Sequence, residues 1–311
     1  MTIPLDSIDF KIKLPKLPKS FNVIETSAPS IKERQRAIDV MSETLKLGKC
    51  RTADLPHGTA YFSHRGEVEF FQASGAVWSR DAEAEQKYDN ELRRWPDLIK
   101  EEGDNDTRFA LPEKISYQLL AHSKDLISEA DLVDKAMDGG RVLLDQVAQL
   151  SEKGEIMQSG AGGASVIYNY SIEGLPVFGA GAKSTLSFEP VDGQPKIVGG
   201  LHVWRSPSKA RKIEMSSVEE ALSIGLLQDP ELAIYAKKGG KIIVTRLEFG
   251  YLALPAMMQQ RYLFPVFDIQ GKMMMERDKL GYFAFSRYHH AASMDSYKKT
   301  DLYAPYLASM N

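Results

Sequence analysis

Apolar positions in the first quarter of the chain change from a helical spacing to a two-residue alternation. Residues 30–48 begin with a capping box formed by Ser30 and Glu33, continue with apolar residues every three or four positions, and end at Gly48. This pattern predicts one helix. The alternation that follows predicts three antiparallel strands, separated by short turns, at 59–64, 67–71 and 76–80.

The middle of the chain shows the same change of period. Pro112 is placed to open a helix, and a second capping pattern at Ser128 is followed by helical spacing of apolar residues as far as Leu150. We therefore expect helices over most of 112–150. Alternation then returns and predicts strands at 165–172, 175–178, 183–188 and 196–205, with a turn at 192–193.

The last hundred residues repeat this order. A capping pattern at Ser216 predicts a helix that Asp229-Pro230 closes. Strands are predicted at 241–251, 261–269, 272–275 and 282–285. Helix followed by antiparallel strands thus occurs three times, which predicts an α+β fold of tandem helix-on-antiparallel-sheet modules.

The same pattern suggests how the chain is divided. Residues 11–20 alternate basic and apolar side chains around two prolines, which predicts an extended arm. We expect a homodimer from this arm and the apolar strands. Four regions are predicted: the arm at 1–29, a helix with three strands at 30–110, a helical segment with a central sheet at 111–212, and a helix with a sheet at 213–311.

Composition excludes several functions. The 311 residues carry 39 Lys and Arg against 42 Asp and Glu, so the net charge of -3 gives no general attraction to nucleic acid or to an anionic membrane. Cys50 is the single cysteine, which excludes an intramolecular disulfide and multi-cysteine metal clusters. The glycine-rich segments at 160–163 and 174–184 lack the strand and helix context of a nucleotide-binding loop. We expect neither a metal nor a cofactor.

The N-terminal segment bears on location. It contains Asp6, Asp9 and a proline where a signal peptide has a basic start and a long apolar run. No stretch approaches the roughly 18 apolar residues of a transmembrane helix. We therefore expect a cytoplasmic protein that does not enter the membrane.

Aromatic residues gather on single faces of several predicted strands. The two-residue period puts Tyr168 and Tyr170 on one face, and His202 and Trp204 on another. If such faces meet, they form an aromatic cleft suited to a small apolar, oxygenated molecule. The alternative is a packed core in which the tyrosine hydroxyls are hydrogen-bonded.

Within this cleft, three residues are candidates for catalysis. His202 has the chemistry of a general acid or base near neutral pH, Asp268 would orient it, and Tyr168 lies on a neighbouring strand. The candidates for substrate binding are Tyr170, Trp204, Tyr262, Phe264, Arg246 and Glu248.

Two segments resemble a known family. Residues 168–183, which contain Gly-Leu-Pro-Val, resemble the strand–turn–strand core of PepSY-like domains. Residues 247–251 and 262–271 resemble the later module of the YycH/YycI type of tandem PepSY-like protein. The resemblance implies a helix on a curved antiparallel sheet, duplicated in tandem. It also implies a mostly non-catalytic family of regulatory or peptidase-inhibiting modules outside the membrane, with no shared catalytic residue.

Three functions remain open. The first is a cofactor-independent enzyme, of the isomerase or cyclase type, acting on a small apolar, oxygenated substrate in the aromatic cleft. The second is a non-catalytic carrier that uses the same cleft. The third is a protein-binding regulator or inhibitor of the PepSY-like kind, which would use a sheet edge or the methionine-rich surface.

Overall fold

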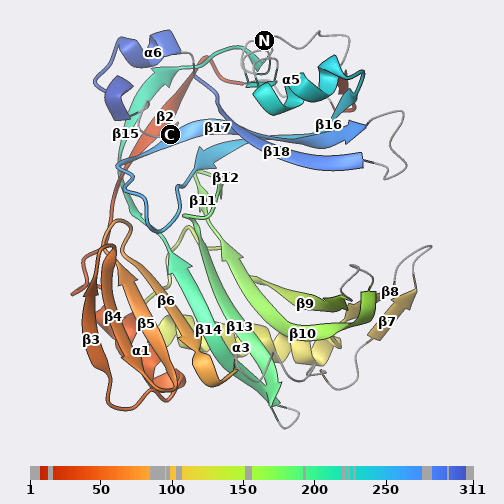
Figure 1. Cartoon of the computed structure of the whole chain (residues 1–311). Helices are drawn as coiled ribbons and strands as arrows, with labels where there is room; N and C mark the ends of the chain where they lie inside the picture. Colours follow the sequence, from red (N-terminus) through yellow and green to blue (C-terminus); the bar gives the residue numbers. More distant parts are fainter. Residues whose placement is uncertain are drawn as a thin grey trace.

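The computed structural model contains two large β-sheets (Figure 1). It describes residues 8–12, 17–84, 95, 99–102, 107–150, 156–191, 194–218, 222, 225–226, 229–274, 282–292 and 294–305. Within these ranges strands hold far more of the chain than helices do. We call the two sheets the helix-backed sheet and the mixed sheet.

The helix-backed sheet is antiparallel and has the strand order β3-β4-β5-β6-β14-β13-β10-β9. Its N-terminal half is the meander β3 (Arg51–Leu55), β4 (Gly58–Ser63), β5 (Gly66–Phe71) and β6 (Ala76–Asp81). Its other half is β9 (Arg141–Leu150), β10 (Ile156–Asn169), β13 (Lys183–Val191) and β14 (Gln194–Val203). The pairing of β6 with β14 joins the two halves into one sheet.

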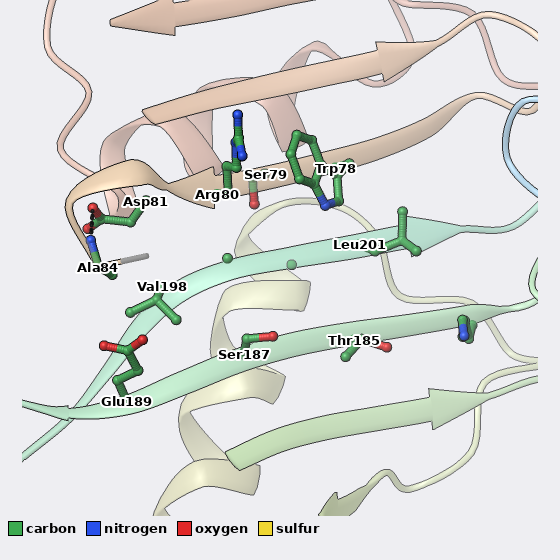
Figure 2. Close-up of a pocket in the computed structure, with 13 residues that line it drawn as sticks. Trp78, Ser79, Arg80, Asp81, Ala84, Thr185, Ser187, Glu189, Val198 and Leu201 are labelled. Carbon is green, nitrogen blue, oxygen red and sulfur yellow. Dashed lines mark hydrogen bonds between the residues drawn. The ribbon is translucent and has the colours of Figure 1, made fainter. Parts of the chain in front are cut away.

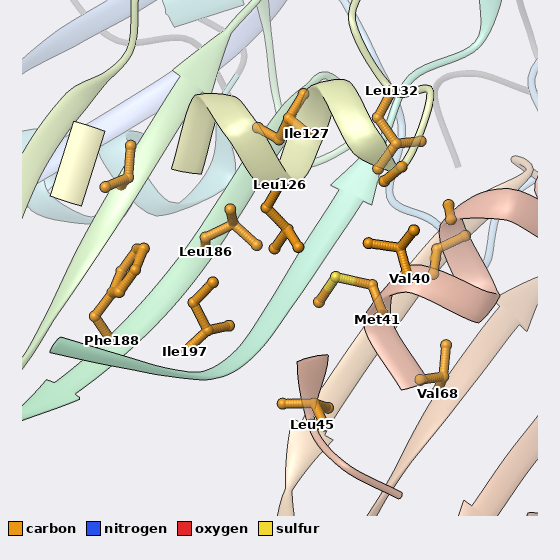
Figure 3. Close-up of a cluster of buried hydrophobic side chains, with 14 of the residues drawn as sticks. Val40, Met41, Leu45, Val68, Leu126, Ile127, Leu132, Leu186, Phe188 and Ile197 are labelled. Carbon is orange, nitrogen blue, oxygen red and sulfur yellow. The ribbon is translucent and has the colours of Figure 1, made fainter. Parts of the chain in front are cut away.

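Two helices cover one face of this sheet. They are α1 (Gln35–Thr44) and α3 (Glu113–Glu129). Figure 3 shows Met41 of α1 and Leu126 of α3 directed toward Leu186 and Ile197 of the sheet. Because successive strand residues point to opposite faces, the other face keeps the half-buried polar residues of the same strands. A small hairpin of β7 (Ile99–Glu102) and β8 (Thr107–Ala110) forms a separate two-stranded sheet beside β9.

The mixed sheet combines strands from both ends of the chain (Figure 1). Its path is β11-β12-β16-β17-β2-β15, with β1 beside β16 and β18 beside β17. The strands are β1 (Ile8–Phe10), β2 (Ser20–Ser27), β11 (Ser171–Ile172), β12 (Leu175–Phe178), β15 (Ser206–Glu214), β16 (Lys241–Leu252), β17 (Tyr262–Met274) and β18 (Tyr282–His290). The helices α5 (Pro230–Lys237) and α6 (Met294–Lys298) pack against this sheet. β1 and β12 run parallel to β16, which makes the sheet mixed.

The predicted α+β fold of tandem PepSY-like modules is wrong. The protein is mainly β, and α1 and α3 share one face of one sheet instead of each opening a separate module. The helical spacing assigned to 142–150 is strand β9, in which Val142 and Leu144 pack inward while Leu143 is exposed. An apolar run of this kind fits both periods, and pairing with β10 decides between them.

Other local predictions have mixed outcomes. The Ser30–Glu33 capping box is present, with Glu33 N–H donating to Ser30 Oγ and Ser30 N–H donating to the Glu33 carboxylate. The three strands after it are confirmed. Ser128 does not begin a helix but lies in the last turn of α3, whereas Asp229, expected to close a helix, donates its N–H to the Leu226 carbonyl oxygen and also caps the start of α5. The turn at 192–193 and much of the helix predicted at 216–229 lie outside the described residues.

Membrane spanning by a helix can be assessed for the described ranges. None of the helices found there combines the length and the apolar character required to cross a bilayer.

Candidate functional site

The predicted residues Tyr170, His202 and Trp204 do come together, between the helix-backed sheet and the start of the mixed sheet. Ser184 Oγ lies 2.6 Å from His202 Nδ1 and 2.8 Å from the Tyr170 hydroxyl. The Tyr170 ring stacks on Trp204 with centroids 4.2 Å apart. All of these side chains are buried, so the arrangement is a hydrogen-bonded core and not an open cleft.

Burial sets the protonation of this cluster. The pKa of His202 lies well below its ordinary value because the imidazole is desolvated and the Arg34 guanidinium repels its charged form. The neutral imidazole and the Ser184 hydroxyl therefore share a hydrogen bond through Nδ1, in which the tautomer of the ring decides which group donates. Burial also raises the pKa of Tyr170 above its ordinary value, so the phenol stays protonated. A cavity of about 20 Å³ borders His202 and Ser184, which is the size of a single water site.

The other catalytic candidate on this sheet, Tyr168, belongs to a different cluster. Its hydroxyl makes a hydrogen bond with Ser123 of α3, and its ring packs in the core beneath the helices. Burial raises the pKa of Tyr168 despite that hydrogen bond. Tyr168 is thus a buried link between β10 and α3.

Asp268 is not near His202, because it lies on β17 of the mixed sheet. Its carboxylate accepts hydrogen bonds from Gln270 Nε2 at 2.6 Å and from Ser286 Oγ at 3.1 Å. On the neighbouring strand β16, Arg246 and Glu248 pair with each other at 2.7 Å, half exposed to solvent. These three residues make a polar patch on the mixed sheet.

The remaining two candidates form a third cluster. Tyr262 and Phe264 are buried on β17, and the Phe264 ring meets Tyr297 of α6 edge to face with centroids 5.4 Å apart. Val23 and Ile213 from β2 and β15 pack against the same group. The nine predicted residues are therefore distributed over several clusters, and together they line no common cleft.

A different site lies on the face of the helix-backed sheet that the helices leave open. Figure 2 shows Trp78 and Arg80 on β6, Leu201 on β14, and Thr185 and Ser187 on β13, all around one hollow. Its volume is about 380 Å³, within the range of small-molecule sites. We call it the Trp78 pocket. The full lining is Trp78, Ser79, Arg80, Asp81, Ala84, Lys183, Thr185, Ser187, Glu189, Val198, Gly199, Gly200 and Leu201.

Strand register explains why a hollow forms at this point. Trp78, Leu201 and Thr185 form one row across three adjacent strands, while Gly199 stands between Arg80 and Ser187 in the next row. A Cβ built on Gly199 would lie 2.7 Å from the Ser79 carbonyl oxygen, so this position of β14 stays without a side chain. The flanking side chains therefore surround an open floor.

Two consecutive charged residues of β6 border the pocket. Arg80 Nε donates to Glu67 at 2.6 Å, and its guanidinium lies 5.4 Å from the centre of the Trp78 ring. Asp81 is fully buried and accepts from Lys196 Nζ at 2.8 Å. Burial alone would raise the Asp81 pKa, but the hydrogen bonds from Lys196 and from the Ala84 N–H outweigh burial and lower it.

Three polar side chains of the lining have no hydrogen-bond or ion-pair partner among the residues that the structure describes. The hydroxyls of Thr185 and Ser187 and the Lys183 ammonium make no hydrogen bond or ion pair with any other residue that the structure describes. Polar groups held on adjacent strands without internal partners are suited to orient a ligand. The sequence carried a signal for this site: the alternation Lys183, Thr185, Ser187 opposite the adjacent glycines 199 and 200.

In the part of the chain that the structure describes, no three His, Cys, Asp or Glu side chains are grouped as metal ligands. The Trp78 pocket accordingly offers hydroxyls, an ammonium and an aromatic ring.

Comparisons with known proteins add little. No family model matches the chain, and no curated protein matches it. A crystal structure of an uncharacterized protein from Eubacterium rectale is similar at a TM-score of 0.49, with 9% sequence identity, over 88% of this chain and 85% of that one. Similarity at this level supports neither a family nor a function.

Proposed function

We propose that this protein is a non-catalytic carrier that binds a small molecule in the Trp78 pocket. The observation that supports it is the combination, on three adjacent strands, of an apolar wall, unpartnered hydroxyls and an open glycine floor. Trp78 and Leu201 provide area for a flat apolar group, and Thr185 and Ser187 provide directional hydrogen bonds.

The distribution of the expected catalytic groups favours a carrier over an isomerase or cyclase. His202 and Asp268 belong to different sheets, and each is buried and hydrogen-bonded to its own neighbours. General acid–base catalysis needs its groups within hydrogen-bond reach of one substrate. The cavity beside His202, at about 20 Å³, does not admit a substrate.

Filling the pocket tests this function. The probe is N-phenyl-1-naphthylamine, an uncharged aromatic dye whose fluorescence rises in apolar surroundings. Ser187→Phe places a ring in the hollow without removing a described hydrogen bond, so we expect dye affinity to fall by about tenfold or more. Dye titration and isothermal calorimetry measure this change.

The matched control is Leu143→Phe, on the same open face but outside the pocket. It should leave dye affinity unchanged. Trp78→Phe should in addition reduce the quenching of tryptophan fluorescence by the bound dye, since Trp78 lines the pocket whereas Trp95 and Trp204 do not. Equal dye binding by wild type and folded Ser187→Phe protein would refute the proposal.

A further inference from the structure

We propose that the molecule bound in the Trp78 pocket is an organic acid, whose anionic group Lys183 binds while its apolar body covers Trp78 and Leu201. This inference rests on the proposed carrier function and names the class of ligand. It starts from the placement of one cation, Lys183, at the end of β13.

Lys183 is the cation of the lining whose charge has no described counter-ion. Arg80 is paired with Glu67, and the buried Asp81 is paired with Lys196. Lys183 makes no such pair with any residue that the structure describes. An ammonium half-buried beside an unfilled hollow, with no anion of its own, favours a ligand that supplies the anion.

The acidic residues of the pocket lie at its other end. Glu189 is six residues from Lys183 on the same strand, or roughly 20 Å along an extended backbone. That separation exceeds the Debye length of about 8 Å at physiological ionic strength, so Glu189 does little to neutralise Lys183, and Asp81 is already paired with Lys196. The pocket is therefore polarised along β13, with its positive end at Lys183.

Strand geometry sets where the rest of the ligand lies. Lys183, Thr185 and Ser187 point to the same side of β13 at intervals of about 6.6 Å. The row formed by Thr185, Leu201 and Trp78 crosses the sheet next to Lys183. An acid bound at Lys183 thus has a hydroxyl donor one step along the strand and an apolar surface beside it.

Two dyes with the same ring system separate charge from apolar binding. They are 8-anilino-1-naphthalenesulfonate, which is anionic, and the uncharged N-phenyl-1-naphthylamine. For wild-type protein we expect the anionic dye to bind more tightly, and added salt to weaken the anionic dye alone. Lys183→Met keeps most of the length of the side chain and removes its charge, so it should weaken the anionic dye by about tenfold and change the uncharged dye less than about twofold.

Two further variants complete the test. Lys183→Arg should retain most of the preference for the anionic dye, because the charge remains. Lys209→Met removes an exposed lysine from β15, outside the pocket, and should change neither dye.

The outcomes distinguish this inference from the proposed function. Unchanged binding of the anionic dye by Lys183→Met, or equal weakening of both dyes, overturns the organic-acid assignment. The carrier function still stands in either case if Ser187→Phe blocks the uncharged dye. Failure of both dyes to bind wild-type protein, or binding that Ser187→Phe does not reduce, overturns both proposals.

Discussion

At the scale of single residues, His202 shows how burial can turn a candidate catalytic group into a structural one. The spacing of His202 and Trp204, and of Tyr168 and Tyr170, predicted shared faces. The structure does bring Tyr170, His202 and Trp204 into contact. The same reasoning could not place Asp268, because which strands become neighbours depends on pairing between distant segments. Chemical type was thus readable from the sequence, whereas proximity was not.

The depressed pKa of His202 predicts acid sensitivity. Its folded pKa lies well below the unfolded value of about 6.5, so the unfolded chain binds more protons once the pH falls below about 6.5, and the free energy of unfolding then decreases. Burial, and then repulsion from His289, lowers the pKa of His290 to about 3, which acts in the same direction.

His202→Asn tests this contribution, since its amide oxygen can accept from Ser184 but does not titrate. Between about pH 7.5 and pH 5, the loss of unfolding free energy should be smaller in this variant, by up to about 2 kcal/mol. Urea denaturation at both pH values measures the loss of unfolding free energy. The control is the substitution His64→Asn, at an exposed histidine. A loss in His202→Asn as large as that of wild type would contradict the assignment.

At the scale of elements, the strands with clear alternation were predictable and those with mixed patterns were not. β4, β5 and β6 follow from their turns, whereas the apolar spacing of β9 predicts a helix. The Trp78 pocket escaped prediction for a related reason. In the sequence, Gly199 is an isolated glycine within a predicted strand. Only the pairing of β14 with β6 on one side and β13 on the other shows that this glycine leaves space for the pocket.

A substitution at Gly271 tests how closely β17 packs against β16 and β18 in the mixed sheet. A Cβ at this position of β17 would lie 2.3 Å from the Ile243 carbonyl oxygen and 2.6 Å from the Phe285 ring. Gly271→Ala should therefore lower the free energy of unfolding by about 1–3 kcal/mol, because the backbone of β16 has to move. In Gly139→Ala the new methyl group meets nothing within 4 Å, and the change should stay within about 0.5 kcal/mol. If Gly271→Ala and Gly139→Ala have equal free energies of unfolding in chemical denaturation, then β16 and β18 accommodate the added methyl group without cost, and the prediction is wrong.

At the scale of the whole molecule, Arg205 connects the two sheets. It follows β14 of the helix-backed sheet, is buried, and donates to the carbonyl oxygens of Leu254, Pro255 and Met258, which come after β16 of the mixed sheet. Such a contact could not be read from the sequence, since an arginine beside Trp204 and a proline has the composition of an ordinary surface turn.

Arg205→Met keeps most of the side-chain volume and removes all three hydrogen bonds. We expect the free energy of unfolding to fall by more than about 2 kcal/mol, because three carbonyl groups lose the buried, charged donor that they share. Amide hydrogens in 253–261 should also exchange faster. Arg211→Met, which breaks an exposed ion pair with Asp301, should change stability little. Unaltered exchange in 253–261 would argue against a connection through Arg205.

The place of β2 in the mixed sheet has a consequence for how the protein is made. β2 is hydrogen-bonded to β15 and to β17, so its partners are synthesised about two hundred residues after it. Every strand of the helix-backed sheet has left the ribosome once residue 203 is out. β2 therefore emerges before the helix-backed sheet and yet is among the last strands to be paired, so the nascent chain must keep it from pairing elsewhere until its partner in β17 arrives.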